Sequence, residues 1–303
     1  MAVNKIFTLF LLAAFAPAFG AMEDRELVYD RLNQGNLDGL EQIFNHWKSN
    51  RPKDMEISEA YGTYYYQKAL KRGKPASAQP ALTETISLHD PKVEGIFGNE
   101  WDRDSVNGDL LRKAEQCWKK AIRSYPWRLD LYLGLAGLYR DLGDFESQYR
   151  LLGQGLQYAD KHRKKLEWEN RQKLPQPSRK FLPAVLQNHA LFYFRKGQPQ
   201  ANEKAFRLAK LAVTFYPNRS CAYNSMAAYY FRKGDFQRSL KYLLIANQKN
   251  PKDSLVLNNI GGLLESLEKR KEAAIYYRRV VKLHNDAKSV EEARNHLERE
   301  DRN

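Results

Sequence analysis

Large and small apolar residues alternate along the chain at helical spacing, in an order that repeats. The clearest stretch runs from Ser220 to Asp253, where Gly234 separates two apolar runs and Pro251 follows the second. Its large positions are Tyr223, Met226, Tyr230, Phe236 and Leu243, and its small ones are Ala227, Ser239 and Ala246. Because two antiparallel helices approach closely only where side chains are small, this pattern predicts a helix-turn-helix unit that ends at the proline.

The same frame recurs before and after this stretch. Pro217 and Pro251 lie 34 residues apart, a period at which helix pairs stack upon one another. Further units are predicted at 129–162, 183–219 and 254–287, and the last of these lacks both the turn glycine and the final proline. Three extra residues between Gly197 and Ala205 predict a longer turn between the helices of the 183–219 unit.

Two weaker units precede these repeats. In the first, residues 23–33 are predicted to form a helix, and an apolar run from Leu37 to Trp47 a second one. In the next, Gly62 lies in the pattern of a first helix, whose partner appears only around Ala114 and Trp118. Residues 71–107 therefore form an insertion, and loops of this length inside a compact domain are usually functional or disordered.

Residues 23–287 as a whole resemble a tetratricopeptide repeat protein of about six units. The resemblance implies an all-α fold, a right-handed α-solenoid in which each helix pair buries its apolar face against its neighbours. The expected divisions are degenerate repeats at 21–128, a repeat at 129–162, a basic connector at 163–182, three repeats at 183–287 and a capping helix at 288–303. We expect the connector to prolong the preceding helix to about Lys173. Ser289 and Glu292 form a capping-box pattern for the last helix.

The resemblance also implies a peptide-binding groove, lined by fixed positions of the first helix in each repeat. These positions hold Gln187, Asn188, Phe194, Arg195, Asn224, Phe231, Arg232, Asn258 and Asn259. Side-chain amides suit an extended peptide because each has a donor and an acceptor, and the arginines could hold carboxylates. The two near-copies FYFRKG and YYFRKG are expected to place Phe194 beside Phe231 and Arg195 beside Arg232. The alternative is that these residues are solvated or serve inter-repeat packing.

The first twenty residues have the pattern of a cleaved secretory signal peptide. Lys5 precedes an apolar run at 6–15, and small residues follow at Ala18 and Gly20. A periplasmic or secreted protein is therefore expected, with a retained membrane anchor as the alternative. The net charge of +14 favours an acidic partner, and an exported chain seldom meets nucleic acid.

No catalytic motif accounts for the polar residues, so a non-catalytic scaffold or adaptor of the cell envelope or secretion pathway is predicted, without cofactor or metal. Cys117 and Cys221 are too far apart in the repeat frame for a disulfide, and His189, at a core position, is expected to be hydrogen bonded. Two alternatives remain open. One is an enzyme or ligand site built by residues 71–107, and the other is docking on anionic lipid or polysaccharide. The docking patch would be Lys161, Arg163, Lys164, Lys165, Arg171, Lys173, Arg179 and Lys180 around Trp168.

Overall fold

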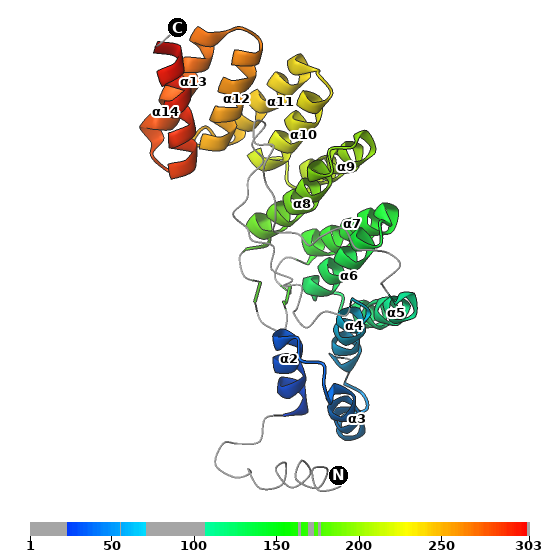
Figure 1. Cartoon of the computed structure of the whole chain (residues 1–303). Helices are drawn as coiled ribbons and strands as arrows, with labels where there is room; N and C mark the ends of the chain where they lie inside the picture. The colour runs from blue at the N-terminus through cyan, green and yellow to red at the C-terminus, as the bar shows by residue number, and fades with distance from the viewer. Residues whose placement is uncertain are drawn as a thin grey trace, which may run out of the picture. The chain divides into compact units, whose positions relative to one another are not determined.

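The regular secondary structure of the described part of the chain is helical. The computed structural model describes residues 23–54, 56–70, 107–162, 165–168, 173–174 and 177–301. Within these ranges there are thirteen helices and, apart from isolated bridge residues, no β structure (Figure 1). The helices fall into two compact units, with a boundary at Tyr125 and Pro126. The signal-like residues 1–20 and almost all of the insertion at 71–107 lie outside the described ranges.

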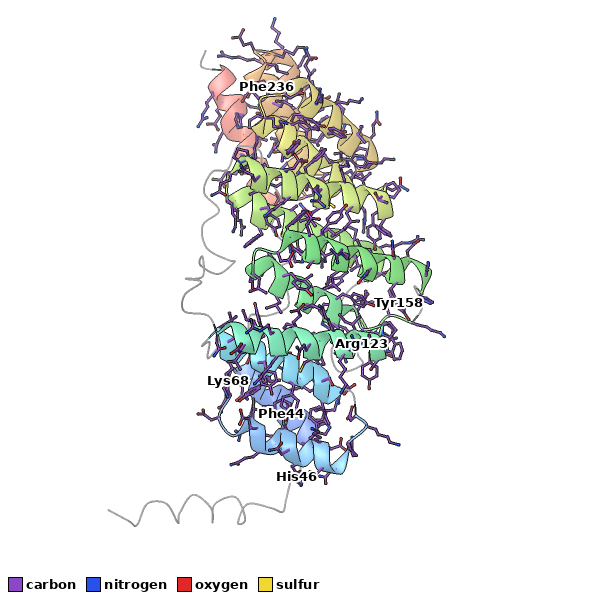
Figure 2. All side chains as sticks on the ribbon, turned by 90° about the vertical axis from the view of Figure 1, so that its right-hand side faces the viewer. Phe44, His46, Lys68, Arg123, Tyr158 and Phe236 are labelled. Carbon is purple, nitrogen blue, oxygen red and sulfur yellow. The ribbon has the colours of Figure 1, made fainter. Side chains whose placement is uncertain are left out.

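The first unit contains two helix pairs. Its helices are α2 (Asp24–Gln34), α3 (Leu40–Asn50), α4 (Glu56–Ala69) and α5 (Gly108–Ser124). Phe44 lies in the interior, stacked on Tyr61 with ring centroids 4.0 Å apart, whereas His46 on the same helix is exposed (Figure 2). The helix around Gly62 does pair with the one around Trp118, although the insertion separates them in sequence.

The second unit contains four helix pairs and a final helix, in the arrangement of a helical repeat solenoid (Figure 1). Its helices are α6 (Leu129–Asp141), α7 (Phe145–Lys161), α8 (Ser178–Arg195), α9 (Pro199–Phe215), α10 (Ser220–Arg232), α11 (Phe236–Lys249), α12 (Ser254–Ser266), α13 (Arg270–Leu283) and α14 (Ala287–Asp301). We call the first member of each pair a first helix and the other a second helix. The predicted all-α repeat fold is confirmed.

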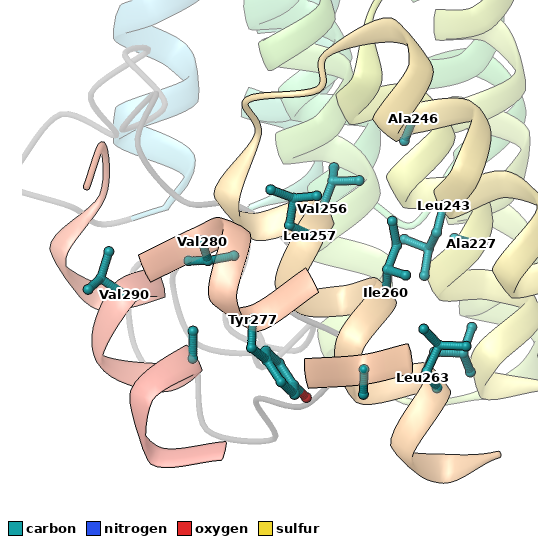
Figure 3. Packing of buried hydrophobic residues seen from close by; sticks show 13 residues of the cluster. Ala227, Leu243, Ala246, Val256, Leu257, Ile260, Leu263, Tyr277, Val280 and Val290 are labelled. Carbon is teal, nitrogen blue, oxygen red and sulfur yellow. The ribbon is translucent and has the colours of Figure 1, made fainter. Parts of the chain in front are cut away.

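Small residues control how closely the helices of a pair approach. In the last pair, a Cβ placed on Gly261 would lie 2.6 Å from the ring of Tyr277, so only glycine fits there. The preceding pair has Ala227 and Leu243 at the same two places in the frame, and both side chains are fully buried. Figure 3 shows Leu243 and Tyr277 in one core. A smaller residue on the first helix therefore accompanies a larger one on the second.

The prediction of a longer turn in the 183–219 unit is wrong. The turn between α8 and α9 consists of residues 196–198, and α9 has 17 residues where α11 has 14. The additional residues thus lengthen the helix by almost one turn. Pro199 accounts for this, because proline is favoured at the first position of a helix. Ala205, Ala209 and Ala212 remain buried in frame with Pro217, so the extra turn lies at the N-terminal end of α9.

The predicted helical extension of the connector is also wrong. α7 ends at Lys161, and the backbone of Glu167 bonds to Trp127 O (3.1 Å) and Leu129 N (3.2 Å) in an extended bridge. The driving force is burial, because Trp168 is 5% exposed and meets the Phe181 ring edge-on at 5.0 Å. Trp168 therefore belongs to the core and cannot be the centre of a surface docking patch.

The final helix begins slightly earlier than predicted. α14 starts at Ala287, and the side chain of Asp286 accepts a hydrogen bond from Ser289 N (3.0 Å). Asp286 is therefore the capping residue, and Ser289 lies inside the first turn, where its side chain is buried. The carboxylate at Asp286 also suits the positive end of the helix dipole.

Candidate functional site

The first helices of three successive repeats carry all nine predicted peptide-binding residues. α8 holds Gln187, Asn188, Phe194 and Arg195, α10 holds Asn224, Phe231 and Arg232, and α12 holds Asn258 and Asn259. α8 packs beside α10, and a side-chain hydrogen bond joins α10 to α12. We call the surface formed by these three helices the first-helix face.

Two asparagines of this face bond to one another across a repeat boundary. Asn259 Nδ2 donates to Asn224 Oδ1 at 2.9 Å, and each residue is 1% exposed. Similarly, Asn258 Nδ2 donates to the carbonyl oxygen of Ser289 at 2.8 Å and so ties α12 to α14. These amides hold neighbouring first helices together, and a role for them in peptide binding remains a prediction.

Other amide atoms of the face have no hydrogen-bond partner within the described residues. They are Gln187 Nε2, Asn188 Nδ2 and Asn258 Oδ1. Asn188 is 8% exposed and Asn258 is 7% exposed, so neither side chain is freely solvated. Buried polar groups are nearly always bonded, and leaving one unpaired costs about 1–3 kcal/mol. These three atoms are themselves buried, so a ligand reaches them only when the side chains turn outward.

The aromatic and basic residues are arranged differently from the side-by-side pairs expected from the sequence. Phe194 is buried, and the guanidinium of Arg232, from the next repeat, lies over its ring at 5.5 Å from the centroid. Phe231 is half-buried against Phe236, with centroids 5.5 Å apart. Desolvation lowers the pKa of Arg232 below its ordinary value, although the guanidinium remains charged near neutral pH. The exposed Arg232 and the half-buried Arg195 are the basic residues among the nine predicted positions.

Comparison with known families identifies one segment. Residues 225–289, from within α10 to the start of α14, match the family described as "Tetratricopeptide repeat". This segment consists of tetratricopeptide repeats. No curated protein matches the chain.

Solved structures of tetratricopeptide repeat proteins resemble the chain only distantly. PilF of Pseudomonas aeruginosa is 12% identical, with 90% of this chain and 95% of that one covered, at a TM-score of 0.40. YrrB, described as a TPR protein with an unusual peptide-binding site, is 13% identical over 62% and 84% of the two chains, at 0.38. MamA is 15% identical over 57% and 81%, at 0.37.

A buried polar network lies between two of the tetratricopeptide-like pairs. Gln148 Nε2 is 2.9 Å from His189 Nδ1, and the Tyr193 hydroxyl donates to Gln148 Oε1 at 2.5 Å. The expected hydrogen-bonded core histidine is confirmed. Burial lowers the pKa of His189 to about 3, so its imidazole is neutral and can accept from the amide.

Two exceptions to the repeat pattern in the sequence belong to this network, and the structure shows that they contact each other. Gln148 stands where the repeat usually has a small residue, and His189 where it usually has leucine. Each exception alone would leave a polar group buried without a partner. Because the two face each other across α7 and α8, each satisfies the other.

The described residues offer little for other chemistry. They contain no group of three histidine, cysteine or acidic side chains that could hold a metal, and no helix long and apolar enough to cross a membrane. Cys117 and Cys221 are unpaired, as expected, and burial raises the pKa of both thiols, that of Cys221 to about 11. Neither thiol is therefore activated as a nucleophile.

Proposed function

We propose that this protein is a non-catalytic scaffold or adaptor that binds an extended peptide or protein segment on its first-helix face. The supporting observation is that Gln187, Asn188 and Asn258 each carry a buried amide atom without a partner among the described residues. An extended peptide backbone presents alternating donors and acceptors, which these side-chain amides can satisfy once they turn outward. Arg195 and Arg232 favour a segment with acidic side chains. The signal-like N-terminus supports action in the cell envelope or secretion pathway.

If these amides bind a ligand, replacing one of them should change stability and binding in opposite directions. Asn188→Leu replaces an unpartnered amide with an apolar side chain of similar shape, so it should raise the free energy of unfolding by about 1 kcal/mol or more. The same change should abolish partner binding. Loss of function together with gain of stability is characteristic of a binding site, whereas a structural amide would lose stability when replaced.

The second helix α9 offers a matched control. Asn202 is also 8% exposed and its Oδ1 also lacks a partner among the described residues, but it lies away from the first-helix face. Asn202→Leu should therefore be stabilising to a similar extent and leave binding unchanged. Equal loss of binding in both variants would contradict the proposed site.

Photo-crosslinking identifies the partner on the same surface. A photoreactive amino acid at Gln187 should yield protein adducts in cells, whereas one at the exposed Lys210 of α9 should not. Arg195→Glu together with Arg232→Glu should remove the adduct, since both predicted peptide-binding arginines are then reversed in charge. Unchanged adducts in that variant would place the partner elsewhere.

A further inference from the structure

The outward faces of α11 and α13 form a surface that the peptide-binding proposal does not use. Residues 237, 241, 244 and 248 of α11 are all exposed, and so are the residues 34 positions later on α13. α13 is tied to α11 by Arg279, whose guanidinium donates to Asn247 Oδ1 at 3.3 Å. The two stripes therefore lie side by side, and we call them together the outer stripe.

The outer stripe combines positive charge with exposed apolar side chains. Its charged and apolar members are Lys241, Leu244, Lys271, Ile275, Arg278 and Lys282. Ile275 is 56% exposed and Leu244 is 37% exposed, and only one other large apolar side chain of the described chain is as exposed. In the repeat frame Lys241 corresponds to Ile275, and Leu244 to Arg278. Basic and apolar residues thus alternate across the two helices.

Little acidic charge offsets this surface. α11 contains no acidic residue, and α13 contains only Glu272, which forms an ion pair with Lys269 at 3.2 Å. Asp235, at the start of α11, caps that helix and pairs with Arg238. The four cations of the outer stripe therefore have no acidic partner on the two helices that present them.

We propose that the outer stripe docks on an anionic lipid bilayer. Basic residues near such a surface are attracted by its negative potential, each contributing roughly a factor of five in affinity. Exposed leucine and isoleucine between those cations would enter the boundary between head groups and acyl chains. A soluble anionic polymer would use the cations but leave both apolar side chains in water. The combination favours a lipid surface, and it leaves the first-helix face free for a peptide.

Vesicle binding of the full chain tests this proposal. We expect binding to vesicles of phosphatidylcholine with phosphatidylglycerol to exceed binding to pure phosphatidylcholine, and to fall when salt is raised from about 0.1 M to about 1 M. The apolar run at 6–15 is present in every variant, so the ratio between the two vesicle types isolates the charge-dependent part. Lys241→Glu, Arg278→Glu and Lys282→Glu together should reduce that ratio by about 100-fold or more.

Two further variants separate the outer stripe from charge in general. Lys48→Glu, Lys120→Glu and Arg123→Glu make the same change at exposed positions of the first unit and should leave the ratio nearly unchanged. Leu244→Ser with Ile275→Ser should weaken binding about tenfold at every salt concentration. Equal binding by the two triple variants would overturn the proposal. Retention on dextran sulfate without binding to anionic vesicles would also overturn it, in favour of a polymer.

Discussion

Glu268 and Gly234 occupy the same place in successive repeats and share one backbone conformation. Glu268 has φ 61° in the turn between α12 and α13, and Gly234 has φ 74° in the turn between α10 and α11. Residues with a side chain are disfavoured in this left-handed region by roughly 1–2 kcal/mol, which glycine avoids. The repeat that lacks its turn glycine thus keeps the turn, at a cost in stability.

Glu268→Gly should therefore stabilise the protein. After allowance for the greater freedom of glycine in the unfolded chain, we expect a gain of about 0.5–1 kcal/mol in the free energy of unfolding. Thermal or urea unfolding measures this gain. Glu268→Ala is the control, since it removes the charge but keeps a side chain at positive φ. If alanine stabilised as much as glycine, charge rather than backbone conformation would be the cause.

The close approach of Gly261 to Tyr277 predicts opposite effects for two glycine-to-alanine changes. Gly261→Ala places a methyl group against the ring and should lower the free energy of unfolding by about 1–3 kcal/mol. Gly137→Ala in α6 meets no atom within 4 Å and should raise it by up to about 1 kcal/mol through helix propensity. Urea denaturation of both variants decides the matter. A stabilising Gly261→Ala would show that the pair of helices can move apart at little cost.

His189 should make stability depend on pH. Its pKa is lowered to about 3 by burial, whereas in the unfolded chain it returns to about 6.5. Between these values the unfolded chain binds the proton and the folded chain does not, so the free energy of unfolding falls as the pH falls. From pH about 6.5 to about 4.5 the loss due to this group is about 2–3 kcal/mol.

Two histidine variants check the pH dependence. His189→Gln cannot titrate and should flatten the dependence over this range, whatever its effect on stability at neutral pH. His162→Gln, at an exposed position, is the control for replacing a histidine as such. The attribution to His189 fails if the two variants follow the same pH profile.

The start of α14 allows a direct choice between two capping residues. Asp286→Ala removes the side chain that accepts from Ser289 N and should cost about 1 kcal/mol. Ser289→Ala, the position favoured by the sequence pattern, should have a much smaller effect, because its carbonyl bond from Asn258 is kept. Hydrogen exchange along α14 measures both. A larger effect at Ser289 would restore the capping box.

The sequence predicted the helix pairs because each depends on local spacing. The alternation of large and small residues, as at Ala227 and Leu243, is imposed by contacts within one pair and can be counted along the chain. The wrong predictions concern segments whose structure depends on contacts with residues distant in the sequence. The sequence pattern places Trp168 in a basic helix, whereas in the structure it packs against Phe181. The pattern also predicts a loop for the additional residues before Ala205, whereas in the structure Pro199 starts a helix there.

The candidate site was less predictable for the same reason. The repeat frame locates Asn224 and Asn259 on first helices, but not that they bond to each other. Which amide atoms remain unpartnered depends on the neighbouring repeat, as for Asn188 Nδ2. Position in the frame therefore indicates the helix on which a residue lies, whereas the neighbouring repeat decides which of its atoms are hydrogen bonded.

The extra turn at the N-terminal end of α9 makes this repeat different from the one that follows it. A stack of identical repeats has equivalent surfaces every 34 residues. A partner could therefore bind it in several registers, each shifted by one repeat. α9 projects farther than α11 at its N-terminal end, by about 4.5 Å for three residues. Because of this projecting turn, the edge formed by the inter-helix turns differs at α9 from the other repeats. A partner that docked against this edge would therefore have a single register.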